Sequence, residues 1–214
     1  MRFLPVFLDL TSGQVALVGA GPAALNKLRL LQSAGAKVRW FSNDVDVAEE
    51  ALQAGARPSQ LEISFADPLQ ANFSEFIAVV LAAGGSRDED IAARTRESNT
   101  PINVVDRPDL STFIFPAIID RGEVVVAIGT GGASPVLARR LRERIEALLP
   151  ARIGDLAELM GRFRGHFART RHTSQSLRRC WENVVDGPIG ASALAGHLRD
   201  AETAARDDRI KRFA

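Results

Sequence analysis

The chain has 214 residues, of which 46% are hydrophobic and 25% charged, and its formal net charge is +1. This length is sufficient for one large or two small domains with a buried core. The small net charge excludes a strong overall field for nucleic acid or an acidic partner, and no apolar run is long enough to span a membrane. The single cysteine excludes an internal disulfide framework and predicts a reducing, cytoplasmic location.

The most informative stretch is a short apolar run that leads through two glycines into a helical pattern. Residues 15–18 are all apolar, which is typical of a buried parallel strand. Gly19 permits a tight turn, and Gly21 lets a pyrophosphate approach the backbone and the free amides at the helix start. Pro22 fits the first helical turn, and Ala24 completes a G-x-G-x-x-A pattern. The pattern is weak alone, since any strand–helix turn can carry glycines, but its context here predicts a dinucleotide site.

The residues after this helix complete a βαβ unit. The helix should end at Gly35, and residues 37–41 form the second predicted strand. Asp44, with Asn43 beside it, follows that strand, where a carboxylate commonly binds the ribose hydroxyls and favours NAD over NADP. Capping of the next helix is an equally good interpretation of Asp44. Arg39, inside the strand, complicates the choice between the two cofactors.

Further buried strands are predicted at residues 61–65, 76–83 and 102–105. Ligands of parallel sheets lie beyond the carboxyl ends of the strands, so the residues that follow these ends should converge on one edge. These residues are Gly19, Asn43, Gly84 and Asp106.

Two local predictions concern the ends of elements. Residues 5–10, with a proline at the start, indicate a short edge strand. Ser86 and Glu89 have the spacing of a capping box for a helix over residues 87–98.

The pattern changes in the second half of the chain. Residues 113–120 and 123–128 are β-type runs separated by Arg121-Gly122, which predicts a hairpin. A second glycine-rich turn follows, with Ser134 as the cap of a helix that begins at Pro135 and extends through Leu149. The remainder of the chain reads as helical and is rich in arginine.

The chain carries four motifs in order: Gly19-Ala20-Gly21 with Lys27 downstream, Asn103-Val104-Val105-Asp106, Phe113-Ile114-Phe115-Pro116-Ala117, and residues 130–139. Together they resemble siroheme synthase, specifically the N-terminal module of that family, a precorrin-2 dehydrogenase that is also a sirohydrochlorin ferrochelatase. The resemblance covers most of residues 3–150 and is weaker beyond them. The C-terminal methyltransferase domain of that family has no counterpart in the sequence.

The resemblance implies an α/β fold: a Rossmann-like parallel sheet, a β-hairpin dimerisation segment and a C-terminal helical domain. We expect an NAD-binding domain at 1–112, the dimerisation segment at 113–150 and the helical domain at 151–214. We also expect a homodimer, because the apolar hairpin is marginal alone and pairing across a twofold axis would bury it. Packing only on its own helices is the alternative.

Site residues also follow from the resemblance. The family's NAD contacts correspond to Pro22, Ala23, Asn43 and Asp44, and its essential aspartate corresponds to Asp106. A carboxylate at a strand end is chemically suited to take the proton released when precorrin-2 is oxidised, or the pyrrole protons released when iron enters. A turn residue before Arg107-Pro108, in an Asx turn, is the alternative for Asp106.

The second glycine-rich turn is a candidate substrate site. Backbone amides at a helix start and arginine suit the carboxylates of a tetrapyrrole. The residues concerned are Thr130, Gly131, Gly132, Ser134 and Arg139. For most arginines of this half a solvated basic face is the more ordinary interpretation. Thr130 stands where some members carry a phosphorylatable serine.

We therefore expect NAD-dependent oxidation of precorrin-2 to sirohydrochlorin, followed by insertion of ferrous iron to give siroheme. Iron would be a substrate, since the three histidines lack metal-ligand spacing and no resident metal is predicted. Gly84-Gly85 replaces a threonine–acid pair common in the family. Two alternatives remain: a dehydrogenase without chelatase activity, and a non-catalytic module that binds NAD or a tetrapyrrole.

Overall fold

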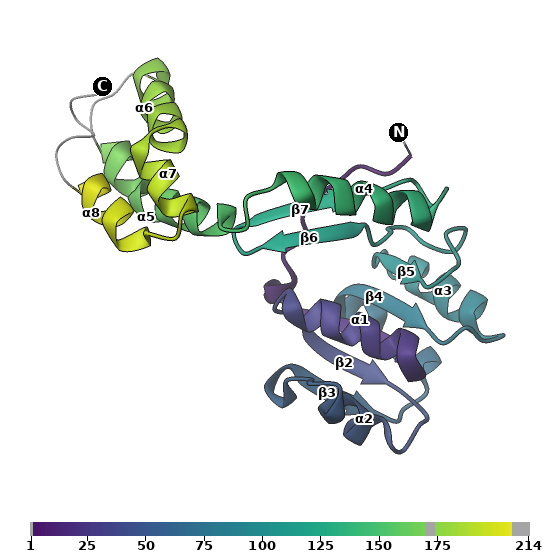
Figure 1. The fold of residues 1–214 in the computed structure, drawn as a ribbon. Coiled ribbons are helices and arrows are strands. Elements are labelled where there is room, and N and C mark those ends of the chain that lie inside the picture. Colours follow the sequence, from purple (N-terminus) through teal and green to yellow (C-terminus); the bar gives the residue numbers. More distant parts are fainter. Residues whose placement is uncertain (1, 170–173, 207–214) are drawn as a thin grey trace. The chain divides into compact units, whose positions relative to one another are not determined.

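The computed structural model describes residues 2–169 and 174–206. The chain divides into two compact units, one ending at Phe115 and the other beginning at Pro116. Figure 1 shows the elements of both units.

The first unit is a parallel sheet of five strands. The strands are β1 (Gln14–Gly19), β2 (Lys37–Phe41), β3 (Leu61–Ser64), β4 (Phe76–Ala82) and β5 (Ile102–Val104). Their order is β3-β2-β1-β4-β5, and every neighbouring pair is parallel. The predicted Rossmann-like sheet is thus confirmed. The direction of winding reverses between β1 and β4, which is where such sheets bind their ligands.

Helices cover both faces of this sheet because its strands alternate apolar side chains. Val15 and Leu17 face one core, with α1 (Gly21–Ser33) and α2 (Val47–Gln53), whereas Ala16 and Val18 face the other, with α3 (Asp88–Glu97). Both faces are therefore closed to water, as the continuous apolar runs of β1 and β4 predicted. Short 3-10 turns connect the elements, at Leu10–Ser12, Pro58–Gln60, Pro68–Gln70 and Phe73–Glu75.

The outer edge of β5 is closed by side-chain hydroxyls. The Ile102 N–H donates to Thr112 Oγ1 at 2.8 Å, and the Val104 N–H donates to Ser111 Oγ at 2.9 Å. Segment 111–113 thus satisfies donors that a sheet edge would otherwise expose.

The predicted strand at residues 5–10 is wrong. Residues 2–9 form no strand, and the Asp9 side chain accepts from the Thr11 N–H at 2.9 Å to start a 3-10 turn. Phe7 is 76% exposed, as no strand of the described chain pairs with this segment. Apolar composition alone does not make a strand without a partner.

The second unit begins with the predicted hairpin, which is confirmed. Strands β6 (Ala117–Arg121) and β7 (Val124–Ile128) are antiparallel, with Gly122 at φ 70° in the turn. The first strand is shorter than predicted, because Phe113 and Phe115 pack against the core of the first unit instead.

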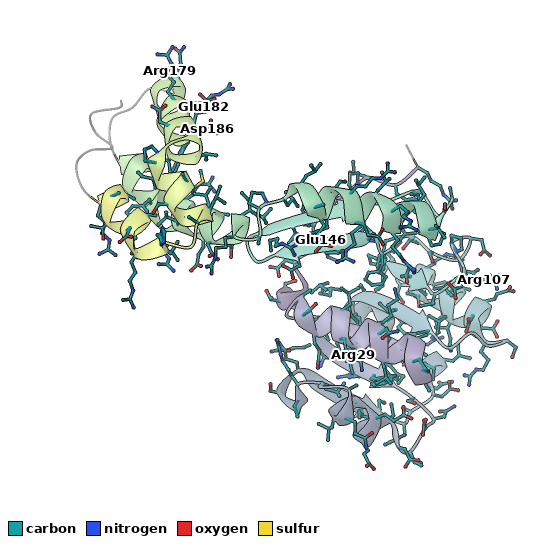
Figure 2. The ribbon with its side chains drawn as sticks, in the orientation of Figure 1. Arg29, Arg107, Glu146, Arg179, Glu182 and Asp186 are labelled. Atoms are coloured by element: carbon teal, nitrogen blue, oxygen red, sulfur yellow. The ribbon has the colours of Figure 1, made fainter. Side chains whose placement is uncertain are left out.

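Helix α4 (Pro135–Leu148) packs beside the hairpin. Glu146, labelled in Figure 2, accepts from Arg121 at 2.9 Å and pairs with Arg142 at 3.1 Å, which ties the helix to β6. Apolar side chains of α4 are uncovered in the single chain: Val136 is 67% exposed and Leu148 82% exposed.

Four helices complete the second unit: α5 (Ile153–Arg169), α6 (Ser174–Asp186), α7 (Pro188–Leu194) and α8 (Leu198–Arg206). Their buried side chains include Leu156, Leu159, Val184 and Ala201. Among the helices of residues 2–169 and 174–206, none combines the length and apolar character needed to cross a membrane.

Candidate cofactor and catalytic site

The first glycine of the motif is required by the approach of two strands. Gly19 has φ 127°, and a Cβ at this position would lie 2.5 Å from the Ala82 carbonyl oxygen at the end of β4. No other residue fits, because the obstacle is backbone and the conformation is one that side chains avoid. The sequence predicted a tight turn here, and the structure adds a close contact at the sheet's reversal point.

The second glycine has the opposite surroundings. Gly21 has φ 73°, and a Cβ there would meet nothing within 4 Å. The N-cap of α1, Ala20, makes no side-chain capping bond, and the first turn holds no acidic residue. Within the described residues no side chain therefore caps the amides at this helix start, and the space beside Gly21 is open, an arrangement that fits the pyrophosphate of a dinucleotide.

A tryptophan that sequence reasoning missed anchors this turn. Trp40 in β2 is fully buried, and its Nε1–H donates to the Gly19 carbonyl oxygen at 2.7 Å. A buried bond of this length fixes the carbonyl and hence the peptide that leads into Ala20. Trp40 and Gly19 are 21 residues apart, so only the pairing of β1 with β2 brings them together.

At the end of β2, Asp44 is half-buried and Asn43 is exposed. Asp44 Oδ1 accepts from the Asp46 N–H at 3.0 Å, just before α2, whose N-cap is Asp46 itself. Asp44 thus shapes the turn that enters the helix without being the cap. Arg39 is held mid-strand by Glu62 at 2.9 Å and does not reach the strand end.

The turn after β4 is held by a buried acid. Gly84 has φ 63°, and a Cβ there would meet nothing within 4 Å. The Gly85 N–H donates at 3.2 Å to Asp88, which is only 4% exposed. The predicted capping box is wrong: α3 begins at Asp88, and Glu89 binds an arginine instead of a backbone amide. Several acids compete at this helix start, and the one closest to Gly85 takes its amide.

Asp106 occupies a strained backbone position after β5. Its φ is 59°, in a turn closed by the Arg107 N–H to the Val104 carbonyl at 3.1 Å. Glycine or asparagine is usual at such a position. The carboxylate makes no hydrogen bond within the described residues, and the Asx turn considered from sequence does not form, because residue 108 is a proline without an N–H. An unbonded carboxylate on such backbone makes Asp106 a candidate functional residue.

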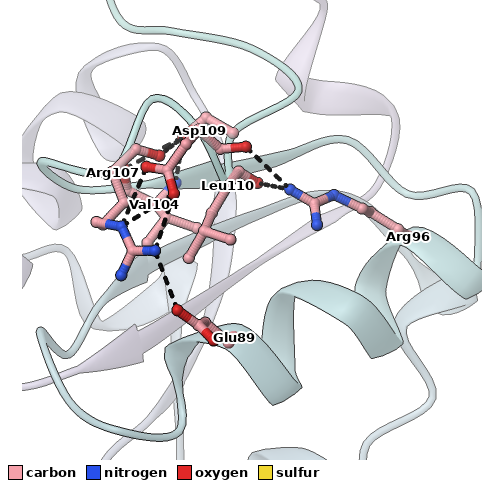
Figure 3. Close-up of polar contacts among 7 residues, drawn as sticks. Glu89, Arg96, Val104, Arg107, Asp109 and Leu110 are labelled. Carbon is pink, nitrogen blue, oxygen red and sulfur yellow. Dashed lines mark hydrogen bonds and ion pairs between the residues drawn. The ribbon is translucent and has the colours of Figure 1, made fainter.

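Arginines fix the loop that follows Asp106 (Figure 3). Arg107 donates to Asp109 at 2.8 Å and to Glu89 at 3.2 Å, and Arg96 donates to the Leu110 carbonyl at 2.6 Å. The hydrogen bonds to Asp109 and Glu89 raise the pKa of Arg107. The guanidinium next in sequence to Asp106 is therefore committed to other carboxylates.

The predicted residues of the first unit lie at one edge of its sheet. The register pairs Gly19 with Ala82, Val18 with Phe41 and Leu81 with Val104, so the four strand ends are aligned. This confirms the expected convergence of the strand ends that precede Asn43, Gly84 and Asp106 on the side of Gly19.

The predicted substrate residues lie in the second unit, in the turn between β7 and α4. The Thr130 hydroxyl accepts from the Ser134 N–H at 3.3 Å and donates to the Ser134 carbonyl at 3.2 Å. Ser134 Oγ accepts from the Leu137 N–H at 3.1 Å, which confirms its predicted capping role. Gly131, Gly132 and Arg139 are exposed.

Of the three histidines, His172 lies outside the described residues, and so does the side chain of His166. In the part of the chain that the structure describes, no group of three or more histidine, cysteine, aspartate or glutamate side chains is placed to hold a metal.

Comparison with known proteins gives three family matches in chain order. A family described as NAD(P)-binding matches residues 6–117, "Sirohaem biosynthesis protein central" matches 121–148, and "Sirohaem synthase dimerisation region" matches 152–208. The model named for dimerisation thus covers the helices after the hairpin.

Relatives agree with these matches. The chain is 40% identical to siroheme synthase of Methylococcus capsulatus and 40% identical to that of Stutzerimonas stutzeri, over 94% of this chain in both cases. It spans 42% and 43% of those two proteins. A solved structure of "SirC, precorrin-2 dehydrogenase" has the same fold, with a TM-score of 0.71 at 18% identity over 99% of this chain and 100% of that one.

Proposed function

Because this chain belongs to the siroheme synthase family, we propose that it oxidises precorrin-2 to sirohydrochlorin with NAD as the hydride acceptor. The family supports the pathway, and the matched fold of SirC, described as a precorrin-2 dehydrogenase, supports the reaction. The chain spans about two fifths of its siroheme synthase relatives, so the proposal concerns one step of what such proteins do. A cytoplasmic location stays a prediction from the single cysteine.

The turn that enters α1 would hold the cofactor. The open space at Gly21 and the uncapped amides suit the pyrophosphate, with Pro22 and Ala23 forming the first helical turn. Asp44 and Asn43 would bind the adenosine ribose, and a carboxylate there disfavours the extra phosphate of NADP. Arg39 does not offset this preference, since Glu62 holds it.

The observation that carries the proposal is the placement of Asp106. NAD, when bound, accepts a hydride, so the enzyme must also remove a proton from the substrate. Asp106 offers an unbonded carboxylate at the same sheet edge as Gly19 and Gly21, on backbone that the fold holds at φ 59°. We assign it as the general base.

An anaerobic incubation of the protein with precorrin-2 and NAD tests the reaction. We expect NADH and sirohydrochlorin to appear in equal amounts. A folded protein that binds NAD without turnover would reject the dehydrogenase and favour the non-catalytic binding module.

The variant Asp106→Asn tests the assignment of the base. It keeps the shape and suits the positive φ, so NAD affinity and thermal stability should change little, while turnover falls by about 10²–10⁴-fold. Turnover at the wild-type rate would exclude proton abstraction by Asp106.

We propose iron insertion as a second activity of the same carboxylate. Pyrrole protons must leave as ferrous iron enters sirohydrochlorin, and Asp106 is the base already placed beside the macrocycle in the first reaction. Adding ferrous iron and sirohydrochlorin to the protein without NAD isolates this step. Siroheme formation no faster than without protein would leave a dehydrogenase only.

The second unit would supply substrate binding and dimer contacts. Gly131 and Gly132, which are exposed and precede the capped helix start, would offer backbone amides to tetrapyrrole carboxylates, together with Thr130, Ser134 and Arg139. The match to a dimerisation region and the uncovered apolar positions of α4 support a homodimer. Light scattering at micromolar concentration tests it, and a stable monomer would reject it.

A further inference from the structure

We propose that Ser111 is a positioning residue for Asp106, whose hydroxyl holds both ends of the turn that presents the catalytic carboxylate. This inference rests on the proposed dehydrogenase function and adds a residue to its machinery. It is carried by the hydrogen bonds that Ser111, which is only 8% exposed, makes at the end of β5.

The direction of the Asp106 side chain depends on its backbone. The side chain is exposed, and its carboxylate makes no hydrogen bond within the described residues. Asp106 is the third residue of a four-residue turn that begins at Val104 and is closed by the Arg107 N–H, which donates to the Val104 carbonyl at 3.1 Å. Its positive φ of 59° is the value that the third residue of a type II turn needs. A contact that fixes this turn therefore also fixes where the base points.

Ser111 binds both ends of this turn through one hydroxyl. Its Oγ accepts from the Val104 N–H at 2.9 Å and donates to the Arg107 carbonyl at 2.9 Å. The Val104 carbonyl, at 3.2 Å, is a second acceptor for the same hydrogen. Figure 3 labels Val104 and Arg107, the two residues that this hydroxyl joins. Asp106 lies between them in the chain.

The loop that returns the chain to Ser111 is itself fixed. The Leu110 N–H donates to the Arg107 carbonyl at 3.1 Å, and Arg96 donates to the Leu110 carbonyl at 2.6 Å. The Ser111 hydroxyl thus connects a fixed loop to a fixed strand end. Removing a buried hydroxyl leaves its backbone partners without hydrogen bonds, so the turn between them would loosen.

The neighbouring hydroxyl shows what Ser111 adds. Thr112 Oγ1 accepts from the Ile102 N–H at 2.8 Å and lies 3.3 Å from the Ile102 carbonyl. Both contacts are to one residue of β5, outside the turn. Of the two hydroxyls, that of Ser111 reaches past the strand end to Arg107. Thr112→Val is therefore a matched control, because it removes a hydroxyl from the same strand edge without touching the turn.

Backbone hydrogen exchange tests the geometry without reference to activity. In Ser111→Ala, the Arg107 amide should exchange about tenfold faster than in wild type, because the turn that it closes is no longer held at its ends. The Val104 amide loses its acceptor and should also exchange faster. In Thr112→Val, the Ile102 amide should exchange faster while Arg107 keeps the wild-type rate. A wild-type rate at Arg107 in Ser111→Ala would overturn the proposal.

Kinetics test the role in the reaction. Ser111→Ala should lower kcat with precorrin-2 about 10–100-fold, since a misplaced catalytic group slows a reaction steeply. NAD affinity and the KM for precorrin-2 should stay within about threefold, because the first glycine turn is unchanged. If Ser111→Ala does not fold, Ser111→Cys keeps the volume, weakens the hydrogen bonds and gives the same comparison.

Two controls separate positioning from stability. Thr112→Val should turn over as wild type. Thr100→Val also removes a buried hydroxyl, which donates to the Phe73 carbonyl at 2.9 Å away from the turn, and should leave kcat within about twofold of wild type. An equal loss of kcat in Thr100→Val and Ser111→Ala, or a loss confined to KM, would overturn positioning.

A double substitution tests whether Ser111 acts through Asp106. Once Asp106→Asn has removed the base, adding Ser111→Ala should lower kcat by no more than about twofold further, because no carboxylate remains to be placed. A further loss as large as that of Ser111→Ala alone would mean that Ser111 acts on something other than the base, and would overturn the proposal.

The two proposals fail in different ways. Absence of wild-type turnover with NAD bound rejects the dehydrogenase, whereas a wild-type kcat in folded Ser111→Ala rejects only the role of Ser111.

Discussion

Two turns in this molecule have nearly the same sequence pattern and opposite local chemistry. Residues 19–23 and residues 129–135 both lead from an apolar strand through glycines into a helix with a proline in its first turn. In the second turn, Ser134 caps α4 and Thr130 bonds to the Ser134 backbone. In the first, Ala20 leaves the amides of α1 uncapped.

The difference shows what a glycine-rich turn needs in order to bind an anion. Glycine opens space for a ligand, but a helix start that its own side chains already satisfy has fewer amides to offer. In the first turn no side chain caps the amides of α1, and the turn is fixed instead by the hydrogen bond from Trp40 to the Gly19 carbonyl. Substitutions can test separately the Trp40 hydrogen bond, the open space beside Gly21 and the missing side-chain cap of α1.

Gly19→Ala should have the largest effect on the fold. A Cβ would lie 2.5 Å from the Ala82 carbonyl oxygen at φ 127°, so β1 and β4 must separate. We expect a loss of about 3–5 kcal/mol in the free energy of unfolding, measured by urea denaturation. Gly131→Ala in the other turn meets no atom within 4 Å and should cost about 1 kcal/mol for its positive φ. Equal losses would contradict the close approach of the strands.

Gly21→Ala separates space from folding. Nothing lies within 4 Å of the added Cβ, so the fold should lose only about 1 kcal/mol for the φ of 73°. The methyl group would stand where the pyrophosphate approaches, and NAD affinity should fall about tenfold or more, which is at least about 1.4 kcal/mol of binding energy. Calorimetric titration with NAD measures it. Unchanged affinity would place the cofactor elsewhere.

Trp40→Phe removes the hydrogen bond that fixes the Gly19 carbonyl. The Gly19 carbonyl loses its buried donor, which should cost about 1–3 kcal/mol of stability. Because the turn is then less fixed, we expect NAD affinity to fall about fivefold, within the energy of one hydrogen bond. Trp181→Phe, in α6, is the matched control and should leave NAD affinity unchanged. An effect on stability alone would make Trp40 a core residue without a role in the turn.

The sequence predicted those parts of the site that depend on residues close together in the chain. The apolar run, the two glycines and the spacing to the next strand specify the turn, the helix and the sheet edge, because each depends on residues close together in the chain. Asp106 was identified by resemblance to a family. From local chemistry alone a turn residue was the simpler interpretation. Asp106 does lie in a turn, but Pro108 excludes the Asx hydrogen bond that its side chain would make there.

The sequence did not predict contacts that depend on the fold. Trp40 reaches Gly19 across paired strands, and Lys27 meets the Phe115 ring from a distant part of the chain. The strand at residues 5–10 failed because pairing requires a neighbour, which the pattern of one segment cannot reveal. Ser86 and Glu89 failed as a capping box because Asp88 is closer to the turn.

Exchanging the caps of the two helices should have the smallest effects and tests the contrast directly. Ala20 has an extended backbone at φ −145° and is exposed, so Ala20→Ser can place a hydroxyl on the free amides of α1. We expect about 0.5–1 kcal/mol of added stability without cofactor, since a cap satisfies one orphan donor. NAD affinity should fall about two- to fivefold, because the hydroxyl competes with the phosphate for that donor. The reciprocal Ser134→Ala should cost about 1 kcal/mol of stability and leave NAD affinity unchanged. Thermal unfolding with and without NAD reads both quantities in one experiment. If Ala20→Ser stabilised the protein and NAD affinity stayed constant, the free amides of α1 would not be what binds the cofactor.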